Sequence, residues 1–156
     1  MDIQHASIEA NLPSAGDICH WVSAALKERR NGLDTELTVR IVDSDEMSTL
    51  NKQFRNKSGP TNVLSFPADL PPELGLPLLG DIIICAPVVV SEAQEQGKTI
   101  RAHWAHMSVH GTLHLLGYDH IKDNEAAAME ALETRILNTL DFPCPYEATD
   151  KEHQVQ

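Results

Sequence analysis

Three histidines lie close together near the middle of the chain, in the segment His110-Gly-Thr-Leu-His114-Leu-Leu-Gly117-Tyr-Asp-His120. Histidines four positions apart lie on one face of a helix, so His110 and His114 can bind one metal ion. Glycine readily adopts the left-handed conformation that ends a helix, so Gly117 would turn the chain and bring His120 to the same ion. Three nitrogen ligands with an open fourth position are typical of catalytic zinc, whose bound water has a pKa of about 7. The spacing predicts one Zn2+ per chain, bound by His110, His114 and His120.

Two further histidines, His103 and His106, fall on the same helical stripe. Along a helix axis His106 and His114 would be about 12 Å apart, which is too far for both to bind one ion. We therefore interpret His103 and His106 as packing residues or as groups that orient the ligands. The alternative for the whole set is that these histidines are ordinary core residues of an apolar helix. Three of them at this spacing, together with the glycine, favour the metal site.

The composition is that of a single soluble globular domain, with 156 residues, 42% hydrophobic and 22% charged. Cys19, Cys85 and Cys144 are odd in number and far apart, which predicts reduced thiols in a cytoplasm rather than a disulfide framework. The N-terminus has no signal-peptide pattern, and the most apolar run, Ile82–Val90, is short and contains Pro87. We expect a cytoplasmic protein with no membrane partner.

The formal net charge of −11 opposes binding to nucleic acid unless the few cations are concentrated in one place. Lys52, Arg55 and Lys57 are concentrated in this way. A basic cluster can also mark the C-terminal end of a solvated helix, where cations interact favourably with the helix dipole. Composition alone leaves both interpretations open.

Apolar periodicity and capping residues predict an alternation of helices and strands. The predicted helices begin at Ser14, at a capping box of Asp43 and Glu46, at Pro87, at Thr99 and at Asp123 or Asn124, and they run to about Arg30, Arg55, Gln96, Leu116 and Leu140. The predicted strands are Glu36–Val42, Asn62–Phe66 and Asp81–Cys85, with a proline-rich loop from Pro67 to Pro77. This order predicts one α/β (α+β) domain over residues 1–140, with an acidic, loose C-terminal tail over residues 141–156.

The histidine spacing is similar to the H-E-x-x-H-x-x-G-x-x-H pattern of metzincin peptidases. Those enzymes carry a glutamate general base where this chain has Gly111. Glycine cannot accept a proton, and loss of a general base typically lowers a rate by about a hundredfold to ten-thousandfold. A metallopeptidase is therefore the second hypothesis, not the first.

The whole string from His110 to His120 resembles the signature of the YbeY family, the bacterial metal-dependent endoribonucleases of ribosomal RNA maturation. The segment Arg55-Asn-Lys-Ser-Gly-Pro-Thr-Asn62-Val-Leu-Ser65-Phe-Pro67 resembles that family's other hallmark, and Gly80-Asp81-Ile also matches. The resemblance covers roughly residues 36–137. It implies a small mixed β-sheet packed against several helices and zinc on a central helix and the turn after it. It also implies a functionally essential Arg55 near the metal.

For such a protein we expect zinc-dependent, single-strand endoribonuclease activity in small-subunit rRNA 3′-end processing and ribosome quality control. Its partners would be ribosomal RNA, the small ribosomal subunit and assembly factors. A third hypothesis is a non-catalytic ribosome-assembly factor with structural zinc, which acidity fits because weak RNA affinity would then matter less.

Phosphodiester cleavage accumulates negative charge, which a planar guanidinium can bind through two hydrogen bonds. We therefore expect Arg55 to clamp the scissile phosphate beside the catalytic metal ligand His114, and Lys52 and Lys57 to hold the flanking backbone. Asn62 and Ser65 either touch the substrate or brace their short strand. Asp81 and Asp119 either orient a ligand histidine or have local structural roles. The nucleophile, whether a zinc hydroxide or a ribose 2′-hydroxyl, stays open.

Overall fold

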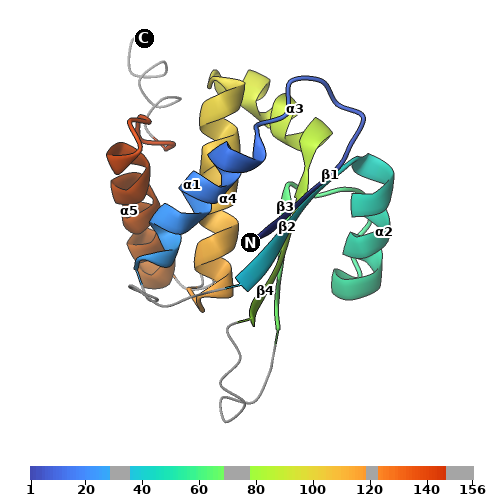
Figure 1. Cartoon of the computed structure of the whole chain (residues 1–156), viewed down its shortest axis with the longest axis horizontal. Coiled ribbons are helices and arrows are strands. Elements are labelled where there is room, and N and C mark those ends of the chain that lie inside the picture. Colours follow the sequence, from blue (N-terminus) through green and yellow to red (C-terminus); the bar gives the residue numbers. More distant parts are fainter. Residues whose placement is uncertain (29–35, 69–77, 119–122, 147–156) are drawn as a thin grey trace.

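The computed structural model describes residues 1–28, 36–68, 78–118 and 123–146. Within them the chain forms the strands β1 (Asp2–Ala6), β2 (Glu36–Val42), β3 (Val63–Pro67) and β4 (Leu78–Cys85). The helices are α1 (Ala15–Leu26), α2 (Ser44–Arg55), α3 (Ala86–Gln96), α4 (Ile100–Leu115) and α5 (Asp123–Thr139). Figure 1 shows one sheet with helices on both sides, which confirms the predicted α/β domain.

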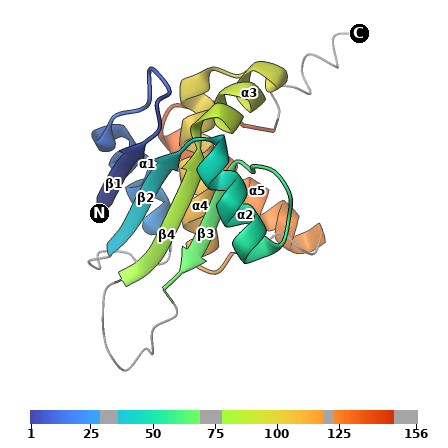
Figure 2. The same cartoon turned by 90° about the vertical axis from the view of Figure 1, so that its right-hand side faces the viewer.

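The sheet is small and mixed, as the family resemblance implied, with the strand order β1-β2-β4-β3. β1 and β4 pair in parallel with β2, whereas β3 pairs antiparallel with β4 at the edge of the sheet, as Figure 2 shows. The sequence analysis missed β1, because Asp2–Ala6 has little apolar periodicity and gains its strand structure from pairing with β2. β4 begins three residues before the predicted Asp81, at Leu78.

The two faces of the sheet pack on separate hydrophobic cores. Ile82 and Ile84 of β4 join the main core with α1, α4 and α5, whereas Ile83 and Cys85 join a second, smaller core. This alternation follows from the two-residue period of a strand. The buried members of the second core are Val42, Met47, Leu64, Ile83 and Cys85. Helix α2 therefore lies on the opposite face of the sheet from α4 (Figure 2).

Two of the predicted helix caps are confirmed and one is wrong. The side chains of Ser14 and Thr99 each accept a hydrogen bond from the backbone three residues later, at 3.1 Å. Asp43 precedes α2 but makes no side-chain cap, because its carboxylate binds the Ser7 hydroxyl and the Ile8 N–H instead. Glu46, the expected partner in the capping box, forms an ion pair with Arg40 at 2.7 Å.

Two predicted boundaries also move. Helix α1 ends at Leu26 rather than near Arg30, which itself lies outside the described residues. The predicted loose tail begins at residue 141, yet its described part packs against the domain. The Phe142 ring packs edge to face on the Trp21 ring, with ring centroids 6.0 Å apart. The Tyr146 hydroxyl donates a hydrogen bond to Glu133 of α5. Residues 147–156 lie outside the described part of the chain.

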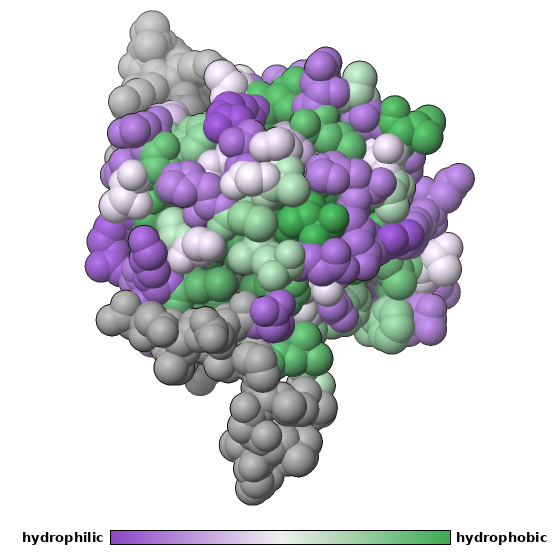
Figure 3. Space-filling view, in the orientation of Figure 1, coloured by the Kyte–Doolittle hydropathy of each residue, from purple (hydrophilic) through white to green (hydrophobic). Residues whose placement is uncertain are grey.

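The face of the molecule in Figure 3 intermingles polar and apolar residues. Four large hydrophobic side chains are exposed among the described residues: Ile8, Phe54, Leu78 and Ile100. None of the helices in this part of the chain has the length and apolarity needed to cross a membrane.

Helix α4 approaches the sheet closely at Gly111. A Cβ atom there would lie 2.8 Å from Ile82 Cγ2 and 3.1 Å from Val63 Cγ2, closer than such atoms normally pack. The Ser65 hydroxyl adds a hydrogen bond to the Gly111 carbonyl at 2.9 Å, which ties β3 to the helix. Residue 111 therefore points into the sheet.

We predict that Gly111→Ala lowers the free energy of unfolding by about 1–3 kcal/mol, because the new methyl group overpacks a buried contact. The matched control is Gly16→Ala in α1, where the nearest atom to a new Cβ is Ser14 Oγ at 3.8 Å. That variant should be neutral or gain up to about 1 kcal/mol from helix propensity. Urea denaturation of both variants measures the difference, and equal stabilities would contradict the packing argument.

Candidate metal centre

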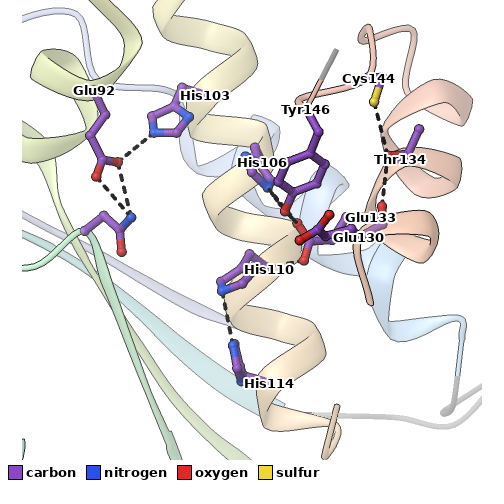
Figure 4. Close-up of polar contacts among 11 residues, drawn as sticks. Glu92, His103, His106, His110, His114, Glu130, Glu133, Thr134, Cys144 and Tyr146 are labelled. Carbon is purple, nitrogen blue, oxygen red and sulfur yellow. Dashed lines mark hydrogen bonds and ion pairs between the residues drawn. The ribbon is translucent and has the colours of Figure 1, made fainter. Parts of the chain in front are cut away.

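Four histidines follow one side of α4, as Figure 4 shows. His103 and His106 are buried, whereas His110 and His114 are partly exposed. The ring centroids of successive histidines are 5.8, 6.1 and 4.6 Å apart. The shortest separation belongs to His110 and His114, the pair predicted to bind metal.

The Nε2 atoms of His110 and His114 face each other at 3.1 Å. Two nitrogens bound to one tetrahedral zinc ion at about 2.0–2.1 Å would be about 3.3 Å apart. This geometry fits a shared ion. Gly117 has φ +101 just after the helix, and the Tyr118 N–H returns to the Leu113 carbonyl at 3.0 Å, which confirms the predicted left-handed helix stop. The third predicted ligand, His120, lies outside the described residues.

A buried carboxylate, Glu133 on α5, connects the histidines to the rest of the core. Its Oε2 binds His110 Nδ1 at 2.9 Å, and its Oε1 binds His106 Nε2 at 2.6 Å. The Tyr146 hydroxyl also donates to Oε1, at 2.6 Å. Sequence reasoning missed Glu133, although an acidic residue four positions after the buried Met129 falls within the apolar stripe of α5 and was a usable signal.

These contacts offer a second way to hold an ion. Donor atoms of His106, His110 and Glu133 all lie within 4.8 Å of one another, so this buried cluster could bind a metal. The two donor sets share His110 but use its opposite nitrogens, since Nδ1 faces Glu133 and Nε2 faces His114. When Nδ1–H donates to the carboxylate, the lone pair of His110 lies on Nε2. The tautomer therefore favours the pair with His114.

The buried groups have strongly perturbed acidities. Burial alone would raise the pKa of Glu133, but hydrogen bonds and charge from His106 and His110 outweigh it and hold that pKa well below its usual range. Burial lowers the pKa of His106, against the opposing effect of Glu133. Within the described residues His106 Nδ1 has no hydrogen-bond partner, so a proton there would be a buried, unsatisfied donor. A neutral His106 beside an ionised Glu133 fits both observations.

His103 takes part in a separate contact, with the neighbouring helix α3. Its Nε2 lies 2.8 Å from Glu92 on α3, and the same carboxylate accepts from the Asn62 amide at 3.2 and 3.3 Å. The Asn62 side-chain oxygen accepts from the Val63 N–H at 2.7 Å. These hydrogen bonds hold Asn62 in place just before β3.

A cavity of about 600 Å³ opens beside the two partly exposed histidines, His110 and His114. Its lining, which we call the cleft, comprises Phe54, Arg55, Thr61, Asn62, Val63, Leu64, Ser65, Phe66, His110 and His114. It extends across the edge strand β3, with the end of α2 on one side and α4 on the other. No carboxylate is among these lining residues, although the chain has a net charge of −11.

The cleft brings together five of the eight metal-binding, catalytic and substrate-binding residues predicted from the sequence. Arg55, Asn62 and Ser65 line it with His110 and His114. Lys52 and Lys57 are exposed near the end of α2 but do not line it.

Asp81 and Asp119 were the two aspartates considered as groups that orient a ligand histidine. Asp81 alternates with Ile82 on β4, so its side chain lies on the face of the sheet opposite α4 and cannot orient these histidines. Asp119 lies outside the described residues.

Comparison with known proteins agrees with this geometry. The solution structure of TM1509 from Thermotoga maritima matches with a TM-score of 0.56 and 25% sequence identity, over 98% of this chain and 92% of that one. A family model described as Endoribonuclease YbeY matches residues 3–141. That match includes the histidine segment, the Arg55 segment and Glu133. The chain therefore belongs to the YbeY endoribonuclease family.

Proposed function

We propose that this protein is a zinc-dependent endoribonuclease that cleaves single-stranded RNA in small-subunit rRNA 3′-end processing and ribosome quality control. One observation carries the proposal: a single cleft joins the guanidinium-bearing end of α2 to the His110–His114 pair. A phosphodiester in this cleft would meet a cation on one side and metal-binding nitrogens on the other. Membership of an endoribonuclease family supports this assignment.

Zinc fits the donors that the described residues provide. His110 and His114 offer imidazole nitrogens at a separation suited to tetrahedral coordination, and we propose His120 as the third ligand. When bound, one zinc ion per chain would supply Lewis acidity and lower the pKa of a coordinated water. His114 would hold that ion at the substrate side of the cleft.

We assign Glu133 to orienting His110 rather than to binding the metal. Its two oxygens already accept hydrogen bonds from His106, His110 and Tyr146. A carboxylate on the distal nitrogen of a ligand histidine fixes the ring orientation and raises its basicity. The low pKa of Glu133 keeps it ionised for this role.

On the other side of the cleft we propose that Arg55 clamps the scissile phosphate. Arg55 is exposed in the last turn of α2, so its guanidinium can form two parallel hydrogen bonds to phosphate oxygens. Lys52 and Lys57 would bind the flanking backbone from outside the cleft. Asn62, just before β3, and Ser65, on β3, line the cleft, and we propose that they contact the RNA there while keeping their hydrogen bonds to the protein.

The acidity of the chain bears on its partners. A net charge of −11 gives weak nonspecific attraction to RNA, so we propose that the small ribosomal subunit or its assembly factors bring the enzyme to ribosomal RNA. A peptidase is disfavoured because residue 111, where metzincin peptidases carry their general base, is a glycine, and a side chain there would crowd Ile82 and Val63.

We predict that His114→Ala abolishes both stoichiometric zinc binding and RNA cleavage, because two nitrogen ligands hold zinc poorly. The purified native chain should contain about one zinc ion. Metal analysis and cleavage of a labelled single-stranded RNA measure both effects, and His20→Ala, an exposed histidine on α1, is the matched control. Zinc retention by His114→Ala would contradict the ligand assignment. Casein cleavage without RNA cleavage would overturn the proposed function, and zinc without any cleavage would favour an assembly factor.

We predict that Arg55→Ala lowers kcat for RNA cleavage by about 10²–10³-fold, the usual cost of losing one transition-state donor. Zinc content should not change, because Arg55 is not a ligand. Arg55→Lys should recover only part of the rate, since an ammonium cannot donate bidentately. Lys27→Ala, an exposed cation at the end of α1, controls for the change in net charge. Full activity of Arg55→Ala would exclude the clamp.

We predict that Glu133→Gln destabilises the fold by about 1–3 kcal/mol, because an amide cannot accept every bond that the carboxylate accepts. Zinc affinity should fall about 10–100-fold, as for other groups that orient a ligand. Glu130→Gln, exposed one turn earlier on α5, should stay within about 0.5 kcal/mol. Thermal unfolding and zinc titration measure these effects. Complete loss of zinc, as in His114→Ala, would make Glu133 a ligand instead.

A further inference from the structure

An aromatic ring stands exposed at the rim of the cleft. Phe54, in the last turn of α2, is 56% exposed, and it is the one aromatic side chain among the exposed large hydrophobics of the described residues. On the same face of α2, Leu50 lies one turn earlier and packs against the second core, so Phe54 stands at the outer end of the apolar face of this helix. Ile8, Leu78 and Ile100, the other members of that set, do not line the cleft.

The ring is held in place rather than free to rotate into solvent. Phe54 packs edge to face on Phe66 of β3, with ring centroids 5.1 Å apart and planes at 62°. Phe66 in turn packs against the second core. Phe54 is thus a supported ring with more than half of its surface accessible.

The chemical groups around the Phe54 ring indicate what kind of ligand could pack on it. Arg55 is the next residue in the chain, and both side chains line the same cavity. The cavity lining offers a guanidinium, an amide, hydroxyls and imidazoles, with no carboxylate among its described residues. An aromatic face beside a phosphate-binding cation is the combination by which proteins bind unpaired nucleotides, since a base stacks while its phosphate is neutralised.

We propose that Phe54 forms a nucleobase subsite, in which an unpaired base next to the scissile phosphate stacks on the exposed ring. The inference rests on the proposed function and gives it a physical basis for strand selectivity. In a duplex both faces of a base are covered by its neighbours, so a paired base cannot use this ring without unstacking. The subsite accepts any base, because every base has a π face.

The test is binding and cleavage of a fluorescent single-stranded RNA by the full chain. Phe54→Leu keeps apolar bulk against Phe66 but removes the π face, and its Kd and KM should rise between about fivefold and a hundredfold. Phe54→Trp should bind as tightly as the native chain or more tightly. Ile100→Ala, which removes an exposed hydrophobic side chain outside the cleft, is the matched control. Thermal unfolding verifies that each variant is folded.

An abasic scan of the same oligonucleotide separates stacking from any other loss. At one position, removal of the base should raise the Kd of the native chain by the same factor as Phe54→Leu does. Removal of that base should raise the Kd of Phe54→Leu little further. If Phe54→Leu bound the RNA with the native Kd, the subsite would be overturned while the proposed function stayed intact. The same holds if, at every abasic position, the losses of affinity from the missing base and from Phe54→Leu simply added. A native chain that binds zinc but neither binds nor cleaves RNA would overturn the proposed function, and the subsite with it.

Discussion

The close approach of α4 to the edge of the sheet is the constraint on which the rest of the site depends. With no side chain at residue 111, the helix axis can settle against Ile82 and Val63, and Ser65 ties its backbone to β3. The adjacent His110 and, one turn later, His114 then face the space beyond the edge strand. A bulkier residue would push the helix outward, and the histidines would move away from Arg55.

Buried polar groups, rather than exposed ones, orient the candidate metal-binding histidines. Glu133 is ionised in the core because the imidazoles of His106 and His110 and the Tyr146 hydroxyl compensate the loss of water. These groups come from three parts of the chain, so α4, α5 and the segment after α5 are joined by a polar network within an apolar core. A buried network of this kind keeps its geometry only while its members stay hydrogen-bonded to one another. The orientation of the His110 ring therefore depends on contacts from all three segments.

Local sequence patterns were enough to predict the helices and three of the four strands, because spacing along a chain fixes which side chains share a face. The family was predicted from the resemblance of two segments to its motifs. The facing nitrogens of His110 and His114 follow from their spacing, whereas the location of Arg55 in the same cleft was implied only by the family resemblance. Contacts between distant segments were not predictable in this way. Glu133 meets His106 across two helices, Tyr146 returns from a segment expected to be loose, and Asp43 binds Ser7 instead of capping α2.

The strand β3 divides the site between two cores of unequal size. His110 and His114 stand on α4, which packs on the large core, whereas Phe54 and Arg55 stand on α2, which packs on the small one. Local stability scales with buried apolar contact, so the helix over the smaller core opens at a lower free-energy cost than α4. We therefore expect the two walls of the cleft to differ in local stability. The wall formed by α2 would exchange its amide hydrogens faster than the wall formed by α4, so Arg55 would be held less firmly than the two histidines that it faces across β3.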